Sequence, residues 1–165
     1  MNKDVPDLLS LWDYAWCDYH QIALPPSNVA KSVIREYLRS DAFGNPFVYF
    51  SGMSDEYKHS LHGPFFRNLI SDFELISIQR FEKEIDAIRH FADEIFGPLP
   101  EEKWQPVRQL AFRICERNSW IFMLRLTEEN KDRFHECGWV LDIFREFVFA
   151  NPNSEIIERL VFGWD

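Results

Sequence analysis

Cysteine and glycine are scarce in this chain, which contains three and six of them in 165 residues. The cysteines, Cys17, Cys115 and Cys137, are too few and too widely spaced for the disulfide framework of a small secreted domain. We therefore expect reduced thiols and a cytoplasmic protein. The sequence also contains no Gly-rich nucleotide-binding loop and no Gly-x-Ser-x-Gly nucleophile motif.

Long apolar runs are missing as well. The longest uninterrupted one is Trp120–Leu124, far short of the roughly 20 residues that a membrane-spanning helix needs. Near the amino terminus, Asp4 and Asp7 occupy the region where a signal peptide has basic and then apolar residues. The sequence therefore predicts neither export by a standard signal nor insertion into a membrane.

Positive charge is in deficit, with 18 basic residues against 27 acidic ones and a net charge of −9. A protein that mainly binds DNA or RNA needs clustered lysine and arginine to neutralise phosphates, so we expect no nucleic-acid partner. An anionic membrane surface is disfavoured for the same reason. The acidity favours a protein partner with a basic surface, or it serves only to keep the protein soluble.

What the chain does have is apolar and aromatic material for a core, 46% and 16% of its residues. Apolar side chains recur at intervals of three and four, which is the helical period. This spacing predicts helices over residues 5–24, 29–38, 71–96, from 106 onward, 131–150 and 154–160. Phe47–Phe50 is the best candidate for a strand, and Trp120–Leu124 suits a buried helix or a buried strand. The sequence thus predicts an all-α compact globule of six to seven helices, with at most one short strand or hairpin, as a single domain of residues 1–165.

Acidic residues are concentrated in one segment. Residues 72–102 contain three basic and nine acidic residues, a net of −6, and residues 103–127 contain five and one, a net of +4. On a helix, Glu82, Asp86 and Asp93 lie within about 40° of one another and opposite the apolar stripe. This pattern is typical of a solvated helix face, or of a surface that binds a basic partner. The predicted partner-binding residues are Glu82, Asp86, Asp93, Glu94, Glu101 and Glu102.

Two weak patterns of metal-ligand spacing occur. Cys-x-x-His and His-x-x-His are separated by about 40 residues, whereas structural zinc sites usually have tighter pairs. Glu-x-x-His and Asp-x-x-His resemble the di-iron motif of helical bundles, but both fall near the ends of predicted helices. We therefore expect no metal, cofactor or catalytic residue. The residues concerned are Cys17, His20, Glu56, His59, His62, Asp132, His135 and Cys137, the last two being further donors two residues apart.

In its size, acidity, aromatic content and expected helicity, the chain resembles the immunity proteins that protect bacteria from toxins. Some immunity proteins that block nuclease toxins, including those of contact-dependent inhibition systems, are wholly helical. The resemblance implies a one-to-one inhibitor that occludes the active site of a toxin and performs no chemistry itself. Two alternatives stay open at this point. One is a metal-dependent helical-bundle enzyme that uses His59 and His135, and the other is a homodimeric regulatory or scaffold protein.

Overall fold

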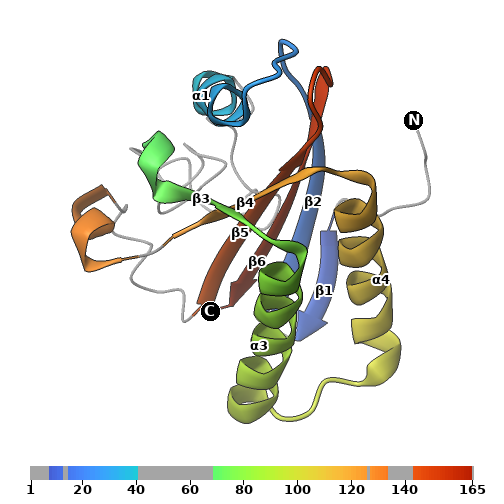
Figure 1. Cartoon of the computed structure of the whole chain (residues 1–165). Coiled ribbons are helices and arrows are strands. Elements are labelled where there is room, and N and C mark those ends of the chain that lie inside the picture. Colours follow the sequence, from blue (N-terminus) through green and yellow to red (C-terminus); the bar gives the residue numbers. More distant parts are fainter. Residues whose placement is uncertain (1–7, 13–14, 41–68, 126, 134–142, 165) are drawn as a thin grey trace, which may run out of the picture.

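The chain folds around an antiparallel β-sheet (Figure 1). The computed structural model describes residues 8–12, 15–40, 69–125, 127–133 and 143–164. In chain order the elements are β1 (Leu8–Trp12), β2 (Ala15–Ala23), α1 (Ala30–Arg39), the 3-10 turn η3 (Ile70–Asp72), β3 (Phe73–Ile76), α3 (Ile78–Phe96), α4 (Glu101–Arg117), β4 (Trp120–Leu124), η4 (Glu128–Arg133), β5 (Ile143–Ala150) and β6 (Ile156–Trp164). The six strands have the order β1-β2-β6-β5-β4-β3, and all neighbours are antiparallel.

The prediction of an all-α globule is therefore wrong, and the fold is α+β. The segment 5–24, predicted as one helix, contributes β1 and β2, and the segments 131–150 and 154–160 contribute β5 and β6. The ambiguous segment Trp120–Leu124 is a strand. The candidate strand Phe47–Phe50 lies outside the described residues.

Helices cover both faces of the sheet. Helices α3 and α4 pack on one face, and α1 packs on the opposite face (Figure 1). Strand β5 shows the consequence, because Phe147 and Phe149 belong to the core under α3 and α4, whereas Phe144 and Val148 belong to the core under α1. A strand buried on both faces loses the alternation of apolar and polar residues by which strands are usually recognised.

The two long helices form within or near the predicted segments, but neither begins where predicted. Helix α3 begins at Ile78 rather than at Ser71, because Phe73–Ile76 is strand β3. Helix α3 begins after Ser77, whose side-chain oxygen accepts a hydrogen bond from the backbone N–H of Arg80 at 3.2 Å. Phe81 and Ile85 are fully buried against the sheet. The helix ends at Gly97, which has a φ of 81°, a conformation that favours glycine. Helix α4 begins at Glu101, five residues before the predicted start near Pro106.

A tight hairpin joins the last two strands. Asn153 has a φ of 58°, and its N–H donates to the carbonyl of Ser27 at 2.9 Å. Asparagine tolerates the left-handed region better than most residues, so the Asn151–Asn153 segment suits a turn. The predicted helix that follows, capped by Ser154, is instead β6, whose residues pair with both β2 and β5. Within the described ranges, no helix has the length and apolar character needed to cross a membrane.

Candidate functional site

The end of the α3–α4 hairpin carries most of the predicted acidic surface. Glu94 lies in the last turn of α3, and Glu101 and Glu102 lie in the first turn of α4. All three are exposed, and we call this group the acidic tip. Carboxylates in the first turn of α4 also interact favourably with the positive end of the helix dipole.

Asp93 and Arg89 hold the backbone of the tip in place. The Asp93 carboxylate accepts hydrogen bonds from the Leu99 N–H at 2.8 Å and from Arg89 Nε at 2.7 Å. A second guanidinium nitrogen of Arg89 donates to the Leu99 carbonyl at 2.8 Å. The same guanidinium lies over the Trp104 ring, 5.6 Å from its centroid. Two side chains of α3 therefore hold the loop between the helices through its Leu99 backbone.

The electrostatics of Asp93 agree with this role. Partial burial pushes its pKa upward, but the Leu99 N–H and the Arg89 guanidinium outweigh this effect and lower the pKa below its usual value. Asp93 is thus predominantly a structural residue of the hairpin. Its carboxylate is not available to a partner in the way that the three exposed carboxylates are.

Two of the tip carboxylates have partners on α3. Glu94 lies 3.2 Å from His90 Nε2, and both side chains are largely exposed. Glu101 lies 3.4 Å from an Arg89 nitrogen and also accepts from the Gln105 amide. Exposed pairs of this kind contribute little to stability because water and salt screen them. Residues 89–103 contain four acidic and two basic side chains, so the tip keeps an excess of negative charge despite these contacts.

The other two predicted residues lie further along α3. Asp86 is exposed, whereas Glu82 is half-buried and contributes to raising the pKa of Cys115 on α4. About 16 Å of helix separates Glu82 from Asp93, at 1.5 Å per residue. The structure therefore brings Asp93, Glu94, Glu101 and Glu102 together, places Asp86 on the adjoining surface and turns Glu82 toward α4.

The cysteines of the described residues do not offer a nucleophile. Burial raises the pKa of Cys17 well above its usual value, and burial raises that of Cys115 to about 11. A thiolate, which is the reactive form, is thus disfavoured at both positions. Cys17 and His20 also lie on opposite faces of β2, because residues three apart on a strand point in opposite directions. Their proposed metal pair is therefore not formed.

Most of the remaining candidate metal ligands fall in parts of the chain that the structure does not describe. Glu56, His59, His62, His135 and Cys137 lie outside the described residues, and nothing is described of the Asp132 side chain. Among the described residues, no group of three or more His, Cys, Asp or Glu side chains is arranged to hold a metal ion.

Sequence reasoning missed a network of charged groups buried beneath α1. Asp18, Glu146 and Arg159, on β2, β5 and β6, each have no solvent exposure. An Arg159 guanidinium nitrogen donates to Asp18 Oδ2 at 3.3 Å, and Tyr37 of α1 donates to Glu146 Oε1 at 2.8 Å. We call these four residues the buried polar network. The partly exposed His20 lies beside it, with Nε2 2.9 Å from Asp18 Oδ1.

Tyr37 connects the two halves of this network. Burial and the neighbouring Glu146 carboxylate raise the pKa of Tyr37 well above its usual value, and Arg159 opposes this effect through its charge and a hydrogen bond. The phenol therefore stays protonated and able to donate. The network ties α1 to three adjacent strands, so it fixes where the helix lies on the sheet.

A second polar cluster joins the end of α4 to β2 and β6. Glu158 accepts hydrogen bonds from Tyr19 at 2.5 Å, from Arg117 Nε at 2.8 Å and from Asn118 at 2.7 Å. Burial tends to raise the pKa of Glu158, but these donors outweigh it and lower the pKa. Burial and the same carboxylate raise the pKa of Tyr19 to about 12. The cluster anchors α4 and has the character of a structural contact.

The sequence analysis missed the charged residues of the buried polar network and of the Glu158 cluster for the same reason. The sequence analysis assigned residues 154–160 to a helix, and on a short terminal helix Glu158 and Arg159 are expected to face water. On a strand they point to opposite faces, and both faces are buried here. The available signal was the alternation Ile157, Arg159, Val161, which places the arginine on an apolar strand face.

Comparisons with known proteins give no relative for this chain. No protein-family model, no curated protein and no solved structure matches it. Its function must therefore be inferred from its own residues.

Proposed function

We propose that this protein is a stoichiometric protein-binding inhibitor, and specifically an immunity protein that neutralises a bacterial nuclease toxin by occluding its active site. The observation that carries the proposal is the acidic tip. Glu94, Glu101 and Glu102 are exposed on the helix ends that flank a loop whose backbone Arg89 and Asp93 hold by hydrogen bonds. Carboxylates on a rigid support bind at a lower entropic cost than carboxylates on a mobile one.

The shape and charge of the tip suit a nuclease as partner. In the view of Figure 1 the α3–α4 hairpin extends beyond the strands of the sheet, so its end can enter a concave surface. The active-site groove of a nuclease is lined with cations that bind phosphates. A group of carboxylates at the end of a protruding helical hairpin is complementary to such a groove, and the opposite charges accelerate association by steering.

The proposal places the protein in the cytoplasm of the toxin-producing bacterium. Both cysteines among the described residues are free and buried, which suits a reducing compartment. A one-to-one inhibitor needs no cofactor and no catalytic group of its own.

Reversal of the charge at the tip tests the proposal. The intact protein is immobilised, and partners from a lysate of the producing bacterium are identified after crosslinking. Association with the recovered partner is then measured for the wild type and for the variant Glu94→Lys/Glu101→Lys/Glu102→Lys. We expect a one-to-one complex with a basic protein, an association rate at least tenfold lower for the variant, and weaker dependence of that rate on salt.

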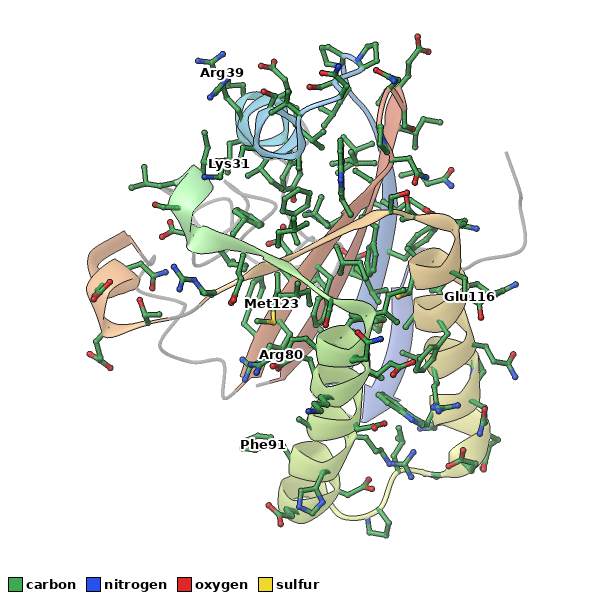
Figure 2. The ribbon with its side chains drawn as sticks, viewed as in Figure 1. Lys31, Arg39, Arg80, Phe91, Glu116 and Met123 are labelled. Atoms are coloured by element: carbon green, nitrogen blue, oxygen red, sulfur yellow. The ribbon has the colours of Figure 1, made fainter. Side chains whose placement is uncertain are left out.

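A matched variant controls for the change in net charge. Glu116→Lys/Glu129→Lys/Glu155→Lys alters three exposed acids away from the tip, and Figure 2 labels the first of these on α4. This variant should associate nearly as fast as the wild type and should still protect cells that express the partner. If the tip variant binds at the wild-type rate, or if the recovered partner has no toxic activity, the proposal is wrong.

A further inference from the structure

Within the described ranges, helix α1 covers only part of its face of the sheet. A helix of ten residues is about 15 Å long and about 10 Å wide, whereas six strands extend about 24 Å across. Helix α1 packs over the core that includes Phe144, Val148 and Val161. Phe73 of β3 and Phe122 of β4 belong to the same core, and Leu75 of β3 lies beside them with its side chain exposed.

An apolar groove lies beside this core. It has a volume of about 980 Å³ and lies between α1, η3 and strands β3 and β4. Phe73 and Leu75 of β3 and Phe122 of β4 form its floor. The two residues of β3 point to the same face because they are two apart, and Leu75 pairs with Phe122 in the sheet register.

Most of the large apolar side chains that are exposed among the described residues line the groove. Five large apolar residues are exposed in these ranges, and three of them, Val29, Leu69 and Leu75, line the groove with 52–53% exposure. Scattered exposed apolar residues need no explanation, but a contiguous group on a concave surface is typical of an interaction site. The groove is therefore the strongest candidate for a second binding surface.

A row of cations borders the groove. Lys31, Arg35 and Arg39 all line it, and all three are exposed. Their spacing of four residues places them on one side of α1, about 6 Å apart along the helix axis. Figure 2 shows Lys31 and Arg39 extending from the helix. Arg39 has a long contact of 3.7 Å with Glu36, and no carboxylate is among the described residues that line the groove.

We propose that this groove binds an acidic segment of a partner protein, with apolar side chains on the sheet floor and carboxylates along the cation row of α1. The inference is independent of the acidic tip, because it concerns the opposite face of the sheet and the opposite sign of charge. Its basis is the charge complementarity between three cations and an anionic segment, in a protein whose net charge is −9.

The arrangement of the cations favours a peptide over a small amphiphile. Lys31 and Arg39 are about 12 Å apart along the axis, which is too far for one carboxylate to contact both. Alternate residues of an extended peptide repeat at about 6.6 Å, and residues four apart on a helix repeat at about 6 Å. Either spacing matches successive cations on α1. An acidic peptide therefore engages the whole row, whereas a fatty acid engages only part of it.

A panel of fluorescent dodecapeptides tests the proposal with the full-length protein. One set combines glutamate and leucine at intervals of two or of three to four residues. Its counterparts replace glutamate with lysine or leucine with serine. By fluorescence anisotropy, we expect at least one Glu/Leu peptide to bind tenfold or more tightly than both of its counterparts. Increasing salt should weaken this binding.

Variants of the groove identify where the peptide binds. Lys31→Glu/Arg35→Glu/Arg39→Glu should weaken binding at least tenfold, and Leu75→Gln should weaken it severalfold, because both remove groups from the groove surface. All four side chains are exposed, so the variants should retain the circular dichroism spectrum and the unfolding midpoint of the wild type.

The experiment also includes a charge-matched control variant and a binding test with lipid vesicles. Lys83→Glu/Arg108→Glu/Arg113→Glu changes three exposed cations of α3 and α4 and should leave peptide affinity within twofold of the wild type. The proposal is overturned if no Glu/Leu peptide binds with a Kd below 100 µM, which corresponds to a binding free energy of about −5.5 kcal/mol. It is also overturned if the groove variants bind as well as the wild type, or if vesicles of phosphatidylglycerol bind in place of peptides.

Discussion

The buried polar network makes Arg159 the most informative single residue for stability. Its guanidinium is the cation that lies between the Asp18 side of the network and Tyr37, which in turn donates to Glu146. All four side chains are fully buried. Arg159→Met keeps much of the aliphatic volume and removes the charge. Two carboxylates then remain in the interior without this cation.

The expected loss of stability in Arg159→Met follows from the burial of the network. Removing one partner of a buried ion pair typically destabilises a protein by about 3–5 kcal/mol, because the remaining charge keeps its desolvation penalty. A domain usually has about 5–15 kcal/mol of stability in total. The variant should therefore fold, but with a much lower midpoint in urea and an unchanged slope.

A second variant separates the loss of charge balance from the loss of packing. Asp18→Asn/Glu146→Gln/Arg159→Met removes all three charges, keeps the shapes of the two acidic side chains and leaves the same methionine in place of Arg159. Replacement of a whole buried ionic group is often close to neutral, so we expect it to recover most of the stability lost in Arg159→Met. The reasoning is refuted if Arg159→Met costs less than about 1 kcal/mol, or if the triple variant is as unstable as the single one.

Three further predictions concern other parts of the fold. Phe81 is fully buried, and its ring centroid lies 5.0 and 5.3 Å from those of Phe147 and Phe149. Phe81→Ala should therefore lower the free energy of unfolding in urea by about 3–5 kcal/mol. A loss below about 1 kcal/mol would contradict the assigned core. The pKa of Glu158 is lowered in the folded state, so its contribution is present above its unfolded pKa and is lost as pH falls through its folded pKa. Glu158→Gln should therefore be about 1.5–3 kcal/mol less stable than the wild type at pH 7. It should also lose less stability than the wild type between pH 5 and pH 3. Parallel curves of stability against pH for the two proteins would contradict this prediction. Gly97 has a φ of 81°, and a Cβ added there would meet no neighbouring atom. Gly97→Ala should therefore lower stability by about 1 kcal/mol through backbone strain alone, and the melting temperature by about 2–4 °C. An unchanged melting temperature would exclude strain at this position.

The helices of the fold were largely predictable because their signals are local. The stripe of Val33, Ile34 and Tyr37 predicted α1, and these residues are buried in the structure. The glycine after Phe96 predicted the end of α3. The predicted start of α3 at Ser71 is wrong, because Phe73–Ile76 pairs with β4 as a strand.

The strands were not predictable by periodicity because both faces of the sheet are covered. In β5, apolar residues of both parities are buried, and in β2 Cys17 and Tyr19 face one core while Ile22 faces the other. Such a strand resembles a buried helix in sequence. Its strand pairing also joins residues far apart in the chain, such as Asp18 and Val161, and a local pattern does not contain that information.

The acidic site was predictable in part, and the groove was not. Charge counting located the segment 72–102, and the structure brings four of its six predicted residues together at the end of the hairpin. It did not distinguish Asp93, which holds the loop, from the exposed carboxylates. The groove depends on how far α1 extends over β3 and β4, which no sequence pattern of a single element specifies.

The three-layer arrangement explains how a small acidic chain keeps two surfaces of opposite charge. The tip belongs to the α3–α4 layer and the cation row to α1, with the sheet between them (Figure 1). Each layer adds about 10 Å, whereas charges are screened over about 8–10 Å at physiological salt. The two surfaces therefore neither neutralise nor compete with each other. The net charge of −9 consequently describes neither surface, and the partner proposed for one surface should experience little of the charge on the other.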